Sequence, residues 1–248
     1  MIKNINKKTI HAKNFIKHFR RHLNLIISIA IKEDKICNIY KKLLLVALLD
    51  AIAKPFCPNC TNKNKFISFI IKFSDWKYIG RISLPHLVQL LGKYPPPDFS
   101  NLRNYAYSKY EEWLQGSVIL LDKDLEFKEV KNYWPKNKDQ DKGHPLTLKG
   151  IKIESLMHYD LLYKYRNSLV HELSEPGISL QWTSCDEPNY GSYTENGQHH
   201  WNLRYPVNFF IQLVETCLNN LEKYLIEERL DPMQFYKFGS YWLEEFNC

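Results

Sequence analysis

A polar stripe near residue 170 holds the side chains best suited to chemistry. Tyr159, Tyr163, Asn167 and His171 follow one another at four-residue intervals, and Arg166 lies five positions before His171. On an α-helix Arg166 and His171 point about 140° apart around the axis, with Asn167 between them. They cannot touch as an i,i+4 pair does. Their long side chains can still converge on a ligand lying over Asn167, or on a twofold-related partner.

The segment around this stripe resembles the signature of the HEPN family. In that signature an arginine and a polar residue precede a histidine near the end of a bundle helix, with four to six residues between arginine and histidine. Four residues separate Arg166 from His171, and Asn167 occupies the polar position. The resemblance also fits helices expected at 36–54 and 207–229, but it says little about residues 60–150.

The resemblance implies a metal-independent endoribonuclease that acts as a homodimer, with two motif helices forming one cleft. RNA cleavage without a metal needs a group that titrates near neutral pH, which makes His171 the general acid or base. Arg166 would hold the phosphate with its permanent, fork-shaped charge, and Asn167 would orient it by donating a hydrogen bond. The expected partner is RNA, with no metal and no cofactor. Such proteins commonly act as toxins or in antiviral defence, where an antitoxin or regulatory partner controls them.

Three other interpretations of these residues stay open. An Arg–Asn pair and a histidine near a helix C-terminus can interact with the negative end of the helix dipole and cap exposed carbonyls. A non-catalytic HEPN-like module that binds a nucleotide or a partner, or that only dimerises, would carry the same motif. A purely structural interaction protein is the third interpretation.

Two further side chains are candidates to support the site. Asp50 is the one carboxylate in the apolar run 43–53, where burying it unpaired would be costly. Arg166 is one candidate partner, which would make Asp50 either a support of the site or half of a structural ion pair. Tyr163 lies one helical turn from Arg166 and is the second supporting candidate.

The net charge of +7 is concentrated at the N-terminus. The first 32 residues hold eight Lys and Arg and no Asp or Glu, which leaves the other residues at −1. Apolar residues recur there at three- and four-residue steps, which predicts a basic amphipathic helix within residues 1–34. Its candidate RNA-binding side chains are Lys13, Lys17, Arg20 and Arg21. We expect them to attract RNA phosphates; the alternatives are an anionic membrane surface and a solvated outer face of the bundle.

The cysteines indicate a cytoplasmic protein with free thiols. Six cysteines are too few and too scattered for a disulfide-framed secreted domain. Cys57 and Cys60 have the spacing of a zinc site, but a structural site needs four ligands, and His86 or Cys37 would have to help complete it. Two thiols that are buried or lie in a turn are the favoured interpretation, since a redox pair would be expected near a βαβ pattern and the sequence shows none. No apolar run approaches the roughly 20 residues that cross a bilayer.

Apolar periodicity predicts a mainly α-helical fold. The resemblance implies that this fold is a HEPN-like bundle, a single domain over residues 1–248. The expected helices cover residues 12–30, 36–54, 85–91, 102–114, 151–173 and 207–229. Residues 65–73 fit either a helix or a strand. The clearest helical pattern is a four-residue step of core-facing side chains at Met157, Leu161, Tyr165, Leu169 and Leu173.

Small β insertions complete the expected fold. The inserted region at about 60–150 contains two short strands, at 118–121 and 127–130, and a polar loop at 135–145 that is the expected internal boundary. A β-hairpin insertion is expected at about 177–205. Its strands would cover 177–183 and 200–205, on either side of a polar excursion at 186–198.

Overall fold

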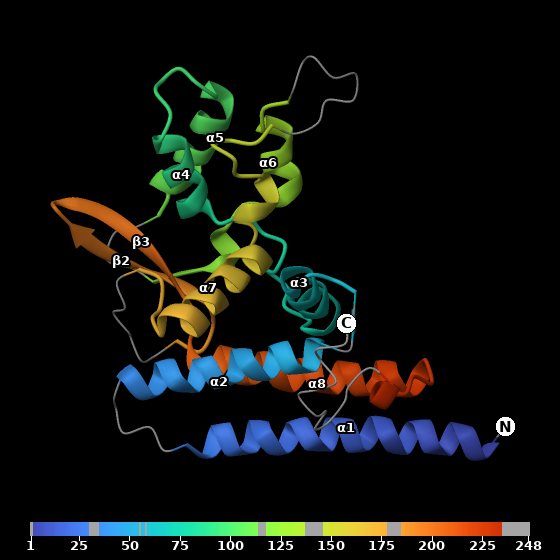
Figure 1. Cartoon of the computed structure of the whole chain (residues 1–248). Coiled ribbons are helices and arrows are strands. Elements are labelled where there is room, and N and C mark those ends of the chain that lie inside the picture. Colours follow the sequence, from blue (N-terminus) through green and yellow to red (C-terminus); the bar gives the residue numbers. More distant parts are fainter. Residues whose placement is uncertain are drawn as a thin grey trace. The chain divides into compact units, whose positions relative to one another are not determined.

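The computed structural model in Figure 1 describes residues 2–29, 35–54, 56–57, 59–113, 118–136, 146–177 and 185–234. These residues are mainly α-helical with one three-stranded antiparallel sheet, which confirms the predicted mainly α class. Contacts divide the chain into a terminal unit, Met1–Asp75 with Phe210–Cys248, and a central unit, Trp76–Phe209. The division therefore does not follow the loop predicted at 135–145, most of which lies outside the described residues.

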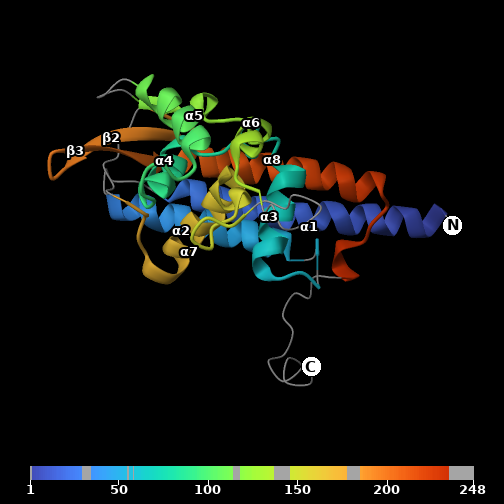
Figure 2. The same cartoon turned by 90° about the horizontal axis from the view of Figure 1, so that it is seen from above.

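The described residues of the terminal unit form four helices and a 3-10 turn. These are α1 (Ile2–Ser28), α2 (Lys35–Ala53), α3 (Asn62–Phe73), α8 (Val207–Glu227, of which residues up to Phe209 belong to the central unit) and η3 (Pro232–Gln234). Figures 1 and 2 show α1, α2 and α8 running alongside one another. The apolar stripe predicted on the first helix is confirmed as its buried face, formed by Ala12, Phe15, Ile16, Phe19, Leu23 and Ile26. Ile27, by contrast, is exposed.

Polar contacts join the helices of the terminal unit. The buried Lys41 of α2 donates from Nζ to the carbonyl oxygens of Ile27 at 3.0 Å and Ile29 at 3.3 Å. A cation is favourable at the carbonyl end of a helix, so Lys41 caps α1 and fixes the α1–α2 hairpin. Asn220 of α8 donates to the carbonyl oxygen of Phe73 at 3.0 Å, at the end of α3.

The segment 65–73, which fitted either a helix or a strand, belongs to helix α3. The side-chain oxygen of Thr61 accepts a hydrogen bond from the backbone N–H of Asn64 at 3.3 Å, which is the geometry of an N-cap. The buried side chains follow the helical period at Phe66, Phe69, Ile70 and Phe73. Helical burial and the cap together outweigh the β-branched and aromatic content that suggested a strand.

The central unit combines short helices with the sheet. Its elements are α4 (Leu84–Gly92), α5 (Ser100–Glu111), β1 (Val118–Leu120), η1 (Leu121–Lys123), α6 (Phe127–Tyr133), η2 (Ile153–Leu156), α7 (His158–Glu172), β2 (Asn189–Glu195) and β3 (Gln198–Arg204). The strand order is β1-β2-β3, with both pairs antiparallel. Among the described residues, every helix of the chain is too short or too polar to span a lipid bilayer.

Two strand predictions are wrong. The predicted strand at 127–130 is the start of α6, where Phe127 and the buried Val130 lie three residues apart, as one face of a helix requires. The predicted polar excursion at 186–198 contains β2, which pairs along its whole length with β3. The predicted strand at 177–183 lies, after its first residue, outside the described residues.

The hairpin turn explains the second error. Asn196 and Gly197 both have positive φ angles, 50° and 75°, as a two-residue type I′ turn between antiparallel strands demands. Asn-Gly is the strongest short hairpin signal in a sequence, and it marks the centre of the hairpin rather than a loop between other strands. The predicted hairpin insertion at about 177–205 is therefore present, but its first strand lies at Asn189–Glu195 and not at 177–183.

Helix α7 carries the predicted motif but begins later than the periodicity suggested. Residues 153–156 form a 3-10 turn, and Met157 is extended because it forms a bridge with Ile82. The core-facing pattern is confirmed at Met157, Leu161, Tyr165 and Leu169, which are buried. Leu173 departs from it: the helix ends at Glu172, and Leu173 has a left-handed φ of 51° and is 52% exposed.

Candidate functional site

The predicted motif side chains lie on the accessible side of α7. Tyr163, Arg166 and Asn167 are half-buried, and His171 is exposed in the last turn. The guanidinium of Arg166 donates to Oδ1 of Asn167 at 3.0 Å, and its carbon lies 5.8 Å from the ring centroid of Tyr163. The structure thus brings three of the predicted residues together and leaves the histidine beside them open to solvent.

His171 does not act as a hydrogen-bonded cap of α7. Its side chain forms no hydrogen bond or ion pair with any described residue, and the chain leaves the helix through the left-handed Leu173 instead. A left-handed residue just beyond the last turn is a common way to end a helix without a side-chain cap. The imidazole is therefore accessible for proton exchange with a bound molecule.

The other predicted residues lie in the terminal unit. Asp50 of α2 is half-buried, and its pairing with Arg166 of the central unit stays a prediction. On α1, Lys13, Lys17 and Arg21 are exposed. Arg20 is exposed too, but it donates to Glu222 and Asn219 of α8, each at 2.8 Å. A phosphate would have to compete with Glu222 for Arg20, whereas the two lysines and Arg21 carry the more available charge.

Cys57 and Cys60 form a disulfide, so the prediction of free thiols is wrong for this pair. Three other cysteines are free as predicted: Cys37, Cys185 and Cys217. The two sulfurs bond each other and not a zinc ion, and His86, a suggested further ligand, is bound to a serine. Within the described parts of the chain, no three or more His, Cys, Asp and Glu side chains gather as a metal site requires.

A buried polar network in the central unit was not predicted. Asp124 lies 2.7 Å from Nε2 of His158 and accepts from the hydroxyl of Tyr190 at 2.8 Å, and both side chains are fully buried. Its other oxygen accepts from the backbone N–H of Leu84 at 2.8 Å. The hydroxyl of Tyr190 also reaches Oγ of Ser83 at 2.7 Å. The network therefore links the start of α4, the segment before α6, the start of α7 and β2.

This network resembles a catalytic triad in composition only. Ser83 lies 2.7 Å from Nδ1 of His86, but Ser83 has no solvent exposure and so cannot attack a substrate. Asp124 and His158 are equally enclosed. Buried charges persist where they are paired and hydrogen-bonded, so the network holds the central unit together.

The chain matches no family model, no curated protein and no solved structure. The HEPN resemblance stays a prediction from the motif.

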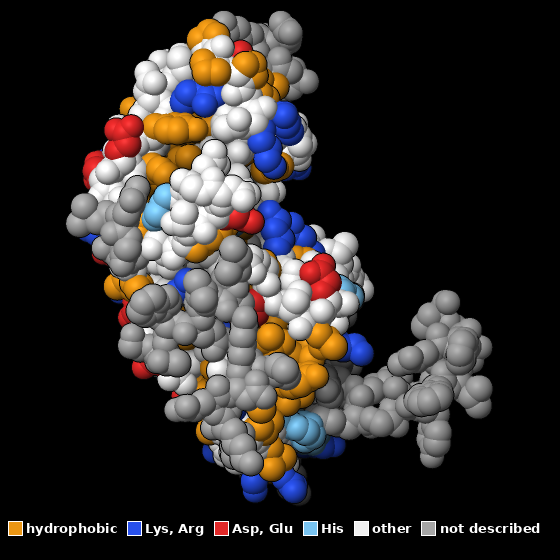
Figure 3. All heavy atoms as spheres, turned by 90° about the vertical axis from the view of Figure 1, so that its left-hand side faces the viewer, with side chains coloured by type: hydrophobic (Ala, Val, Ile, Leu, Met, Phe, Trp, Pro, Cys, Tyr) orange, Lys and Arg blue, Asp and Glu red, His pale blue; other side chains and the backbone are white. Residues whose placement is uncertain are grey.

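An exposed apolar groove lies between α1 and α2. It encloses about 490 Å³ and is lined mostly by hydrophobic side chains, with His18 and His22 at its side. Leu25 and Leu44 belong to this lining and are 57% and 42% exposed. Figure 3 shows hydrophobic and histidine side chains side by side in the lower part of the view, where these helices lie. Partial burial, together with His22 and Arg21, lowers the pKa of His18.

We expect the stability of the central unit to fall in mild acid because of His86. Burial, and then electrostatic interaction with His158 and Lys164, lower the pKa of His86 to about 4 from an ordinary value of 6.5. Between these two pKa values the unfolded chain binds a proton that the folded chain excludes, so the free energy of unfolding decreases as the pH falls. Urea titrations across this pH range should show a smaller decrease for His86→Gln. An unchanged pH dependence in that variant would contradict the assignment.

Proposed function

We propose that the protein is a metal-independent endoribonuclease whose active side chains are Arg166, Asn167 and His171 on α7. The observation that carries the proposal is the half-exposed Arg166–Asn167 pair beside an exposed histidine in the final turn of the same helix. Phosphate binding needs a fixed planar cation, and proton transfer needs an accessible group that titrates near neutral pH. A role as a toxin or an antiviral effector belongs to the same proposal.

The proposed reaction uses the RNA's own 2′-hydroxyl as the nucleophile. The 2′-oxygen forms a bond to phosphorus as the bond to the 5′-oxygen breaks, leaving a 2′,3′-cyclic phosphate and a 5′-hydroxyl. His171 takes the 2′-hydroxyl proton or protonates the leaving oxygen. Arg166 stabilises the charge that develops on the phosphoryl oxygens. Asn167 holds the guanidinium in place through its 3.0 Å hydrogen bond and offers its side-chain N–H groups to the phosphate.

The angle between the Arg166 and His171 side chains supports a dimer. Arg166 and His171 point about 140° apart on one helix, so one phosphate is most easily shared in a groove between two copies of α7. We propose a homodimer whose twofold axis passes near the C-terminal half of α7. Exposed cations on α1, namely Lys13, Lys17 and Arg21, would attract the RNA strand through its phosphates.

The purified protein is expected to cleave single-stranded RNA in excess EDTA. The proposed groups supply acid–base catalysis and charge stabilisation without a metal ion. Gel electrophoresis should show cleavage, and mass spectrometry of the fragments should show 2′,3′-cyclic phosphate or 3′-phosphate ends. Activity only with added Mg²⁺, or fragments with 3′-hydroxyl ends, would overturn the mechanism.

The second candidate function is a non-catalytic module that binds a partner. The groove between α1 and α2 favours it, because exposed apolar patches often mark interaction sites. Assays of RNA cleavage and of association distinguish the two functions. Intact RNA after prolonged incubation, together with an association that Leu44→Lys abolishes and His171→Ala does not, would support the binding module.

A further inference from the structure

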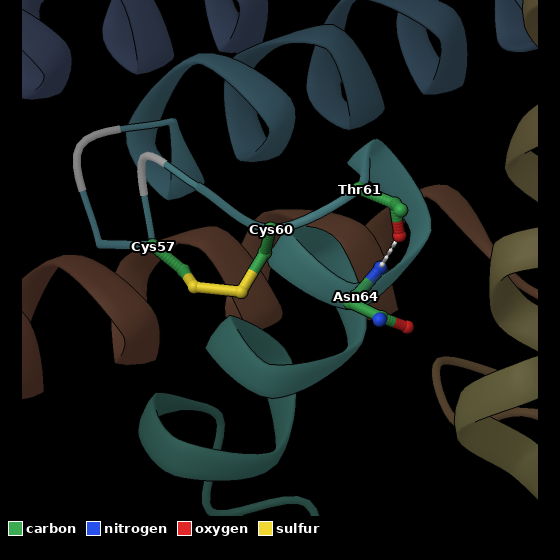
Figure 4. Close-up of a disulfide and its surroundings, with 4 residues drawn as sticks. All are labelled: Cys57, Cys60, Thr61 and Asn64. Carbon is green, nitrogen blue, oxygen red and sulfur yellow. Dashed lines mark hydrogen bonds between the residues drawn. A yellow bond between two sulfur atoms is a disulfide. The ribbon is translucent and has the colours of Figure 1, made fainter.

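The Cys57–Cys60 disulfide occupies the turn that leads into α3 (Figure 4). Both residues are partly exposed, and the backbone N–H of Cys60 donates to the carbonyl oxygen of Cys57 at 3.1 Å. Thr61 then caps the helix. Figure 4 shows the pair directly preceding the cap and the first turn of α3. The two cysteines are therefore partly exposed and lie directly before the start of a helix.

This crosslink contributes little to holding the fold together. A disulfide stabilises a protein mainly by shortening the loops of the unfolded chain, and this one closes a ring of only two intervening residues. The turn is already anchored by Phe56, whose ring lies 5.3 Å from that of Phe73 and 6.3 Å from that of Phe69. The side chain of Lys72 adds a cation 5.0 Å above the Phe56 ring. Loss of the S–S bond would thus leave the α2–α3 connection in place.

The sequence around the pair carries positive and no negative side chains. Residues 51–74 contain no Asp or Glu, and Lys63 and Lys65 lie in the first turn of α3. The N-terminal end of a helix carries a partial positive charge, to which these two lysines add. Positive surroundings lower the pKa of a cysteine and make it a better attacking and leaving group in thiol exchange.

The free cysteines described by the structure lack a second cysteine within reach, although Cys37 also lies in the first turn of a helix, α2. Cys217 is buried in α8, and burial raises the pKa of its thiol far above the ordinary value. Cys37 and Cys185 are partly exposed but are free and have no disulfide partner among the described residues. The pair at the start of α3 is therefore the described thiol site that is equipped for exchange.

We propose that Cys57 and Cys60 form a reversible dithiol–disulfide site that exchanges electrons with a low-molecular-weight thiol. A thiolate of that class attacks one sulfur, so the protein S–S bond breaks, a mixed disulfide forms and the other cysteine leaves as a thiolate. A second thiolate attacks the outer sulfur of the mixed disulfide and releases the small-molecule disulfide. Two small thiols are oxidised, the protein disulfide is reduced by two electrons, and the two protons of the thiols pass to the cysteines.

The test begins with the folded, full-length protein in excess reduced glutathione. Samples are quenched with acid and alkylated, and the peptide that contains residues 57–60 is followed by mass spectrometry. We expect reduction at a rate within about tenfold of that in denaturing urea, and a melting temperature lowered by less than about 8 °C. Reduction only after unfolding, or unfolding caused by reduction, would show a structural crosslink and overturn the proposal.

Lysine variants test the electrostatic cause. Alkylation of the reduced pair at neutral pH should slow about threefold or more in the double variant Lys63→Gln and Lys65→Gln, because fewer thiolates are present. The matched control, Lys128→Gln with Lys131→Gln on α6, removes the same charge elsewhere and should alkylate like the wild type. Equal alkylation rates in all three proteins would contradict the proposal and indicate an inert pair. Protection of the reduced pair from alkylation by added Zn²⁺ alone would also contradict it and indicate a metal-binding role.

Discussion

Replacing Asp124 by alanine is expected to lower the free energy of unfolding of the central unit by about 3–5 kcal/mol. The carboxylate pairs with His158 at 2.7 Å and accepts from Tyr190 and from the backbone N–H of Leu84, each at 2.8 Å. All of these polar atoms lie in the interior, so truncation leaves several donors without partners. Urea denaturation followed by tryptophan fluorescence reports the loss, because Trp76 lies 5.8 Å from His158.

Asp122→Ala is the matched control for this prediction. Asp122 lies two positions earlier in the same segment and its side chain is exposed, so the substitution should change stability by less than about 0.5 kcal/mol. The free energy of unfolding of Asp124→Asn should lie between those of the two alanine variants, because an amide keeps one acceptor but adds a donor that faces His158. Equal stability of Asp124→Ala and Asp122→Ala would show that the network does not hold the unit together.

The long helices could be predicted because their burial follows a strict local period. On α8 the buried side chains recur at three- and four-residue steps: Phe210, Leu213, Val214, Cys217, Leu218, Leu221 and Leu225. On α7 the same reasoning fails only where tertiary contacts intervene. Met157 forms a bridge with Ile82, far away in sequence, and so delays the start of the helix. A period of 3.6 residues locates the interior of a helix better than its ends.

The buried network could not be predicted, because its members are related only by the fold. Asp124 and His158 are 34 positions apart, Tyr190 is 66 positions from Asp124, and Ser83 is 107 positions from Tyr190. No local spacing connects them. The motif on α7 was visible because Arg166, Asn167 and His171 lie within two turns of one helix, where sequence spacing determines geometry.

The disulfide shows a different limit of sequence reasoning. The spacing of Cys57 and Cys60 was evident, but the chemical state of two nearby cysteines was inferred from the composition of the whole chain. Few and scattered cysteines favour free thiols on average. The local turn instead brings the two Cα atoms within 5.4 Å, a separation at which a disulfide can form. Whether two given cysteines are free or bonded therefore depends on the local geometry of the chain, which the cysteine content of the whole chain does not show.

His171→Ala is expected to reduce RNA cleavage by about 10²–10⁴-fold while leaving the fold intact. The imidazole is exposed and forms no hydrogen bond or ion pair with a described residue, so its removal should abolish proton transfer and change stability little. His200→Ala removes a histidine of β3, stacked on Tyr193 at 5.3 Å, and should cleave like the wild type. Wild-type cleavage by His171→Ala would exclude the histidine from the chemistry.

Arg166→Lys tests whether the planar, forked shape of the guanidinium is needed in addition to its positive charge. A lysine keeps the positive charge but cannot hold both Asn167 and a phosphate in one plane, so kcat should fall far more than RNA affinity. A fall in affinity alone, with kcat retained, would make Arg166 a binding residue without a role in the transition state.

Mixing two inactive variants tests the shared groove itself. In a dimer of one Arg166→Ala and one His171→Ala protomer, Arg166 of the second protomer and His171 of the first both remain. If a phosphate is held by the arginine of one protomer and the histidine of its partner, one of the two sites is complete.

An equal mixture with exchanged protomers should then recover about one quarter of wild-type activity, because half of the dimers are mixed and each has one intact site. If both groups act within one protomer, no complete pair exists in any dimer and the mixture stays inactive. The divergence of about 140° between the two side chains favours the first outcome.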